Sequence, residues 1–441
     1  MKIKKTISVV LASVAMQFAF AQAQVTTLTI TQAVEKGIAN SKVLRLDSLR
    51  IAQAKNKQQV ISDAAIPNVT ASAGYTRLSP VDPLTFQFPG NPEPVTLFPV
   101  ILNNYTTKVS VTEPIFTGWK LKYTQESYGY LSQASQFDAD KDENEVRFNI
   151  MSAYVSYVKL QLSRQVIAEN MNVAQQRVTD VKSMSVNGTA TENDVLKSQL
   201  YLSNLQLALT DMDNTISVAQ YNLTVLLGLP EGTSIATDTT GLFAAISLLP
   251  EQNYEADALN NRAETKALDS RMQASQNGEK IAASAYYPTV ALGADYVFAR
   301  PNQRILPYVD EFRGTWDVGV SVSWSVTSLF TAKHTVTDAQ LQTEQMRTQS
   351  DMLNENIRME VFQNYAACLT ATNRLAILQQ TLVQAEENSR QVKAKYDQQL
   401  SMMSDVLDAD AAVMQAKVNI ILQRADQTVS YYKLQKSTGK I

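Results

Sequence analysis

The sequence predicts an α/β membrane protein in which a long antiparallel α-helical coiled-coil barrel is continuous with a transmembrane β-barrel. The β-barrel is expected to be built by a trimer, with four strands from each protomer. Three observations predict this architecture. The chain has 14 Gly and 13 Pro, but none falls in residues 320–438, so helices can run there without the usual breakers. Four segments alternate apolar and polar residues, as strands do. The second half of the chain repeats the first at a constant spacing.

The N-terminal residues have the pattern of a secretory signal peptide. Lys2, Lys4 and Lys5 precede an apolar run over residues 7–20, and small residues follow at the expected cleavage site. We therefore expect residues 1–21 to be removed and the mature protein to work outside the cytoplasm. Loss of three lysines changes the formal net charge from −3 to −6 (−3 − 3), which gives no indication of a nucleic-acid partner.

Residue types that commonly bind metals or close disulfides are scarce. Cys368 is the only cysteine, which excludes an internal disulfide framework and a thiolate-rich metal site, and His334 is the only histidine. We expect no metal and no cofactor, and interpret Cys368 as a small buried residue of a helical seam. No segment after the signal peptide has 18 consecutive apolar residues, so any membrane span has to be built from strands.

The first structural repeat is predicted over residues 22–230. It begins with an amphipathic helix over 31–65, followed by strands over 69–76 and 105–112 that flank a proline-rich loop. A long helix is predicted over 119–187 because apolar residues recur at coiled-coil spacing, with Arg164 as the one misfit. A return helix is expected to run to residue 227.

The second structural repeat is predicted over residues 256–441, after an inter-repeat linker or equatorial region over 231–255. At a constant offset of 211 residues, Arg147 matches Arg358, and Asp194 to Leu196 match Asp405 to Leu407. The repeated elements are strands over 290–298 and 316–326, a helix over 331–399 and a return helix with Ser404 as its expected N-cap.

The strand over 316–326 has the clearest alternation in the chain. One side is wholly apolar with Trp316 and Trp324 near its ends, and the other side carries Asp317, Gly319 and serines. This pattern is typical of an outer-membrane barrel strand. Four strands cannot close a barrel in lipid without leaving open edges, so the chain is expected to oligomerise. Two copies would give a filled eight-stranded barrel, and three would give twelve strands around an open lumen.

Together these features resemble the TolC-like outer-membrane efflux protein (outer membrane factor) family over essentially the whole mature sequence. That family has a motif of roughly Gly-x-x-(Ser/Thr)-x-x-Asp-Val before each return helix. The first repeat matches it with Gly188, Thr191, Asp194 and Val195. The second repeat keeps Tyr396 and the residues Asp405 to Ala409 but departs from the family at the turn. Gln399 replaces the usual Gly, Met402 the usual Ser or Thr, and Ser401 an Arg found in some members.

The resemblance implies a passive exit duct in the cell outer membrane, with its helical part in the periplasm, and no enzymatic activity. Its partners would be two further copies in a homotrimer, outer-membrane lipid, a periplasmic adaptor protein and an inner-membrane transporter, in an efflux or type I secretion system. The predicted site residues fall into three groups. They are the constriction at Asp194, Asp405 and Asp408, the gate-associated residues Tyr396 and Ser401, and the adaptor-docking tips at Asn187, Gly188, Thr189, Thr191, Gln399 and Met402.

Two other functions compete with this one. A secreted coiled-coil scaffold explains the heptads but not the four amphipathic strands. An enzyme could use Asp405 and Asp408 as an acid/base pair on one helix face, but the sequence has no nucleophile motif, glycine-rich loop or histidine pair to accompany them. The aspartates also have a purely structural interpretation, because carboxylates in the first turn stabilise helices. The exported substrate and the cognate adaptor and pump are left open.

Overall fold

The structure is a computed structural model that describes residues 26–96 and 100–441, and the predicted signal peptide lies outside the described residues. The chain divides into two compact units, each of which takes segments from both predicted repeats. Among the described residues, unit 1 comprises residues 26–48, 138–265 and 352–441, and unit 2 comprises residues 49–137 and 266–351. Within the described ranges, no helix combines the length and the apolar character needed to cross a membrane.

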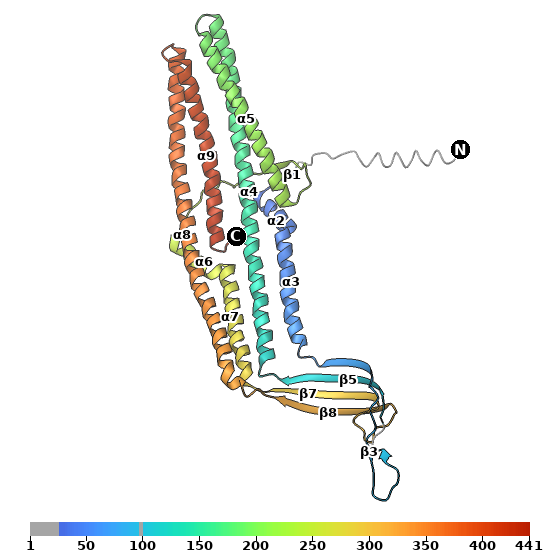
Figure 1. Cartoon of the computed structure of the whole chain (residues 1–441). Helices are drawn as coiled ribbons and strands as arrows, with labels where there is room; N and C mark the ends of the chain where they lie inside the picture. The colour runs from blue at the N-terminus through green and yellow to red at the C-terminus, as the bar shows by residue number, and fades with distance from the viewer. Residues whose placement is uncertain (1–25, 97–99) are drawn as a thin grey trace, which may run out of the picture. The chain divides into compact units, whose positions relative to one another are not determined.

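Unit 1 is built largely from four long helices that form two hairpins (Figure 1). The first hairpin pairs α4 (Lys120–Val186) with α5 (Glu192–Leu227), and the second pairs α8 (Ser328–Asp397) with α9 (Met403–Ser437). The parts of α4 and α8 that precede residues 138 and 352 belong to unit 2. The helices predicted over 119–187 and 331–399, and the return helix to residue 227, are confirmed to within a few residues.

The predicted coiled-coil seam of α4 forms the core of unit 1. Two phenols within it bind backbone carbonyls: Tyr154 donates to Leu28 O at 2.6 Å, and Tyr157 donates to Ile235 O at 3.1 Å. These carbonyls belong to β1 (Thr26–Leu28) and β6 (Ile235–Thr237), a parallel pair that the sequence did not predict. Burial raises the pKa of Tyr154 to about 12. The predicted seam positions that are buried in the structure are Ile150, Tyr157, Ile167, Ala174, Val178 and Val181.

The single helix predicted over 31–65 is wrong, because the structure has α2 (Ile30–Asn40) and α3 (Lys42–Asp63). Between them Ser41 adopts an extended conformation with φ −64° and ψ 119°. The side chain of Asn40 donates to Leu227 O at 3.1 Å, and Gly228 in the left-handed region (φ 63°) lies against Asn40. A tertiary contact with the end of α5 therefore ends α2, which local sequence does not reveal.

Two shorter helices follow, the first of which begins within the predicted linker over 231–255. In α6 (Glu251–Asn261), Tyr254 and Ala258 pack in unit 1 against Ile357 and Cys368 of α8. Cys368 is fully buried, as predicted, and burial raises its pKa to about 11. Most of α7 (Ala263–Ala283) lies in unit 2 and leads through η1 (Ser284–Tyr286) into the second pair of strands.

Unit 2 contains a four-stranded antiparallel sheet in the order β2 (Asn68–Arg77), β5 (Asn103–Phe116), β7 (Thr289–Arg300) and β8 (Arg313–Ser323). Both predicted hairpins are confirmed, and pairing of β5 with β7 joins them. β8 ends three residues before the predicted end at 326. Trp324 leaves the ladder, and its indole N–H donates to Tyr286 O at 3.2 Å. In the β2–β5 loop, β3 (Thr85–Phe86) and β4 (Val95–Thr96) form a small additional hairpin.

The strand registers put the predicted apolar residues of all four strands on one face. One row across the sheet joins Ala71, Val109, Tyr296 and Trp316, because each residue is directly opposite the next. The opposite face is polar and carries an ion pair between Lys108 and Asp295 at 2.8 Å. Side chains alternate between the two faces along every strand. The apolar residues predicted for each single strand therefore form one continuous apolar surface across the sheet.

Candidate functional site

The candidate site is the pair of turns that close the two helical hairpins in unit 1 (Figure 1). At the first turn Gly188 has φ 73°, and the next N–H, of Thr189, donates to Met184 O at 2.9 Å. The return helix begins with a capping box. Thr191 N–H donates to the carboxylate of Asp194 at 3.0 Å, and Asp194 N–H donates to the Thr191 hydroxyl at 3.2 Å. These bonds satisfy helix-end groups that would otherwise lack partners.

The second turn has the same backbone geometry although Gln399 replaces glycine. Gln399 has φ 62°, and the N–H of Leu400 donates to Lys395 O at 2.8 Å, as Thr189 does to Met184. Left-handed backbone costs a residue with a Cβ about 1–2 kcal/mol. The duplication thus preserves the turn at the offset of 211 residues, despite a less favourable residue at its bend.

Asp405 caps the second return helix in a way that the sequence did not predict. Its carboxylate accepts hydrogen bonds from Met402 N–H at 3.0 Å and from the Ser401 hydroxyl at 2.9 Å. These donors lower the pKa of Asp405, Met402 contributing most. The prediction that Ser404 is the N-cap is wrong, because Met402 occupies that position and α9 begins at Met403. Ser401 supplies the hydroxyl that Thr191 supplies at the first tip.

The structure brings most of the predicted tip residues around one hollow of about 470 Å³. Met403 lies beneath it, 1% exposed, in a core that includes Val181 and Val406 and joins the two hairpins. Asp408 is exposed on α9. Asn187 and Gly188 are exposed in the first turn, next in sequence to Thr189 of the hollow. These three residues and Asp405 are not among the residues that line the hollow. The predicted residues that line it are Thr189, Thr191, Asp194, Tyr396, Gln399, Ser401 and Met402.

Sequence reasoning missed a charged contact between the two hairpins. Arg177 of α4 donates to Asp410 of α9 at 2.7 Å, and the Ser389 hydroxyl donates to the same carboxylate at 3.1 Å. The two charged side chains are 12% and 18% exposed. A signal was present: Arg177 lies 11 residues before Gly188 (188 − 177), and Asp410 lies 11 after Gln399 (410 − 399), so opposite charges occur at equal distances from equivalent turns.

The surroundings of this ion pair are polar but incompletely hydrogen-bonded. Among the described residues, neither Arg177 Nε nor the Tyr201 hydroxyl has a hydrogen-bond partner. Burial raises the pKa of Tyr201, and the carboxylate of Asp410 adds to that effect. Burial is also the main cause that raises the pKa of Tyr396, and the negative charge of Asp194 raises it further. The tip therefore links a predicted constriction carboxylate, a predicted gate residue and the Arg177–Asp410 pair electrostatically.

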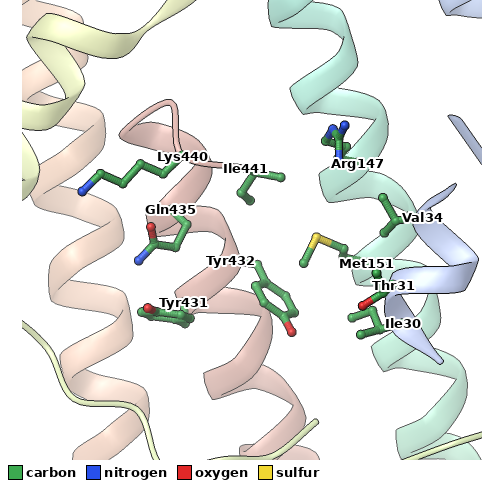
Figure 2. Close-up of a pocket in the computed structure, with 10 residues that line it drawn as sticks. All are labelled: Ile30, Thr31, Val34, Arg147, Met151, Tyr431, Tyr432, Gln435, Lys440 and Ile441. Atoms are coloured by element: carbon green, nitrogen blue, oxygen red, sulfur yellow. The ribbon is translucent and has the colours of Figure 1, made fainter. Parts of the chain in front are cut away.

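A second hollow of about 360 Å³ lies elsewhere in unit 1, away from every predicted site residue (Figure 2). Its cationic groups already have partners, because Arg147 binds Glu143 at 3.0 Å and Lys440 binds Asp257 at 2.5 Å. No group of three or more side chains suited to binding a metal occurs in the described part of the chain. The residues around this hollow are Ile30, Thr31, Val34, Arg147, Met151, Tyr431, Tyr432, Gln435, Lys440 and Ile441.

Comparison with known proteins gives a consistent picture. Residues 256–440 match the family model of the outer membrane efflux protein. No curated protein matches the sequence. Solved structures with the same fold include CusC, at 14% identity and a TM-score of 0.78, with 96% of this chain and 95% of that chain covered. The outer membrane protein VceC of Vibrio cholerae has 15% identity and a TM-score of 0.75, with 93% of this chain and 96% of that chain covered. The CmeC outer membrane channel of Campylobacter jejuni has 15% identity and a TM-score of 0.72, with 93% of this chain and 85% of that chain covered.

Proposed function

We propose that the chain is a TolC-like outer-membrane efflux protein that works as a trimeric exit duct, because residues 256–440 match the family model and the fold of such channels extends along its length. The family is one of channels in the outer membrane with a periplasmic helical tunnel, and not of enzymes. In this proposal the duct passively conducts substrates that an inner-membrane transporter delivers through a periplasmic adaptor.

The observation that carries the proposal is the two-faced sheet of unit 2. On β8, Trp316, Val318, Val320 and Val322 are 62–75% exposed and lie on the apolar face. A face of this kind across four strands would be a large exposed apolar patch in water, and patches of that size normally contact a partner or a membrane. Lipid on the apolar side and a hydrated lumen on the polar side account for both faces. A secreted coiled-coil scaffold would not account for a sheet with one apolar and one polar face.

Unfinished edges in each unit support assembly into a ring. In unit 2, neither β2 nor β8 has a partner strand on its outer edge within the described residues, so β2 of one copy can pair with β8 of the next. In unit 1, exposed apolar residues run along α5 and α8, one helix from each hairpin, which suits contact between α5 of one copy and α8 of another. These residues include Leu196, Leu200, Leu207, Val218, Met359, Phe362, Ile377 and Val383.

Three copies make the proposed barrel a conduit. Each copy contributes four strands, and twelve strands leave an open lumen, whereas eight are filled by their own side chains. The polar face with Lys108 and Asp295 would line that lumen. The same three-fold symmetry would repeat the sites at the helical tips. Each of Asp194, Asp405 and Asp408 would occur three times around the axis, forming the proposed constriction, with Tyr396 and Ser401 beside it.

The exposed turns are the proposed adaptor contact. Asn187, Gly188 and Thr189 at one tip, and Gln399 and Met402 at the other, are all exposed, and the Met402 side chain is 71% exposed. Methionine adapts its shape to a partner surface more easily than other apolar residues. Bulky charged substitutions at these positions should abolish export while the trimer still assembles. Loss of assembly would instead make the turns structural.

The test of the proposal is the mass and behaviour of the protein extracted from outer membranes in detergent. We expect a heat-sensitive oligomer of three chains by light scattering and by electrophoresis with and without boiling. In planar bilayers the same preparation should conduct ions. A stable monomer that stays soluble without detergent would overturn the proposal.

A further inference from the structure

The small hairpin in the β2–β5 loop exposes aromatic side chains. Phe86 pairs with Val95 across it, and the rings of Phe86 and Phe88 meet edge to face with centroids 5.0 Å apart. These two side chains are 52% and 46% exposed, and Leu84 beside them is 60% exposed. Figure 1 shows the hairpin extending beyond the ends of the four strands. Neighbouring apolar side chains that remain uncovered in a structured hairpin indicate a contact surface.

The charge of the loop narrows the kind of partner. Residues 78–103 include Asp82 and Glu93 but no lysine or arginine. Phosphate groups, as in lipid head groups or nucleic acids, are bound chiefly by arginine and lysine side chains. A loop with two carboxylates and no cation therefore does not suit such a partner. Its chemistry suits an apolar protein surface.

The topology of the sheet indicates which protein surface lies beside it. β2 ends at Arg77, where the loop with the hairpin leaves the sheet, and β8 begins at Arg313, where the β7–β8 loop returns. In the proposed ring, β2 of one copy pairs with β8 of the next. Successive antiparallel strands put these two ends on the same side of the sheet. The hairpin of one copy then stands beside the β7–β8 loop of its neighbour.

That β7–β8 loop exposes apolar side chains of its own. Leu306 is 66% exposed and Val309 is 37% exposed. Phe312 is already used within its own chain, because its ring stacks on Phe298 with centroids 5.3 Å apart. Arg300, the last residue of β7, binds Asp310 of the loop at 2.8 Å. Leu306 and Val309 are therefore available to a partner, and a partner that contacts them should be apolar.

We propose that the hairpin is a clasp between copies of this chain. In the clasp, Phe86 and Phe88 of one copy pack on Leu306 and Val309 of the next, at the outer end of the seam where β2 meets β8. The inference rests on the proposed trimer, and it adds a specific contact that the strand pairing alone does not require. Burial of these side chains removes apolar area from water and stabilises the closed ring.

Mixed disulfide cross-linking tests the clasp. In a Cys368→Ala background, one tagged chain carries Phe88→Cys and a second, differently tagged chain carries Leu306→Cys. Co-expression and mild oxidation should give a disulfide-linked dimer that contains both tags, and neither chain alone should give it. The matched control replaces Phe88→Cys with Asp82→Cys, an exposed position in the same loop but outside the hairpin, and should give at least tenfold less dimer.

Each other outcome has a defined meaning. A heat-sensitive trimer without the mixed dimer would overturn the clasp and leave the proposed function standing. Absence of any trimer in the parent protein would overturn the proposed function itself. A chain with both cysteines that cross-links only within itself would show the hairpin folding onto its own loop, against the clasp. As a second readout, Phe86→Ser with Phe88→Ser should lower the temperature at which the trimer dissociates, and an unchanged temperature would also overturn the clasp.

Discussion

Arg177 and Asp410 form a largely buried ion pair, 2.7 Å long, that joins the two hairpins of unit 1 behind their tips. Ser401 stands where some TolC-like proteins carry an arginine, and its hydroxyl donates to the capping carboxylate of Asp405. Arg177 instead approaches the neighbouring hairpin from α4. Because a buried charge needs its partner, the pair should hold the hairpins in register even though it adds little net stability over an apolar contact.

The first prediction concerns this pair. Loss of one partner of a buried ion pair costs about 3–5 kcal/mol, and partial exposure should reduce this to about 2. Arg177→Ala or Asp410→Ala should therefore speed hydrogen exchange at both tips by more than tenfold. Arg177→Leu combined with Asp410→Leu should restore most of the protection, because no charge is left unpaired. If hydrogen exchange in the single-substitution variants equalled that in the parent protein, the packing around Met403 would be sufficient to hold the two hairpins together.

The second prediction uses the two equivalent turns as controls for each other. Gln399→Gly should stabilise the second tip by about 1 kcal/mol, since glycine adopts left-handed backbone without a Cβ penalty. Gly188→Gln should destabilise the first tip by a similar amount, and nothing lies within 4 Å of a Cβ added there, so the effect is one of backbone alone. Local hydrogen exchange at each turn measures both. The two substitutions should change local stability in opposite directions. A change in the same direction at both turns would contradict their shared backbone geometry.

The third prediction concerns pH. Donation from Met402 N–H and the Ser401 hydroxyl lowers the pKa of Asp405 below its ordinary value of 3.8. The cap's contribution to stability is therefore fully present above about pH 4 and is lost as pH falls through the lowered pKa. In Asp405→Asn, protection of the first turn of α9 should no longer depend on pH below about 4. The matched change Ser404→Ala should leave that dependence intact, because Ser404 is not the cap.

The sequence predicted the elements that depend on local patterns. Breaker-free helices, alternating strands and the 211-residue repeat placed α4, α8 and the four strands of the sheet nearly correctly. Failures occurred where a distant contact decides the local structure. Asn40 reaches the end of α5 and ends α2, and β1 pairs with β6 across some 200 residues of chain. The capping role of Asp405 was hidden because Ser401, outside the helix, supplies the hydroxyl that a serine at 404 was expected to supply.

The last prediction separates two roles of the tip carboxylates. Asp405 is bound by Met402 and Ser401 as a cap, whereas Asp408 is exposed one turn further along α9. In a trimer each would form a ring, and like charges a few ångströms apart repel by about 1–4 kcal/mol per pair, depending on the local dielectric. Such rings should bind divalent cations and favour cation passage, as acidic constrictions do in channels.

The isolated trimer should therefore conduct poorly, prefer cations and be blocked by divalent ions from its helical end. Asp408→Ala should weaken the block and the cation preference without changing hydrogen exchange at the tip, because Asp408 is not a capping residue. Asp405→Ala should weaken both and also raise exchange, since it removes the cap as well as the charge. Planar-bilayer recordings with added divalent salt measure the block, and Asp405→Ala with Asp408→Ala should abolish it. If that double variant kept the parent's divalent sensitivity, the aspartates would act only as stabilisers of the helix end, and the constriction would lie elsewhere along the tunnel.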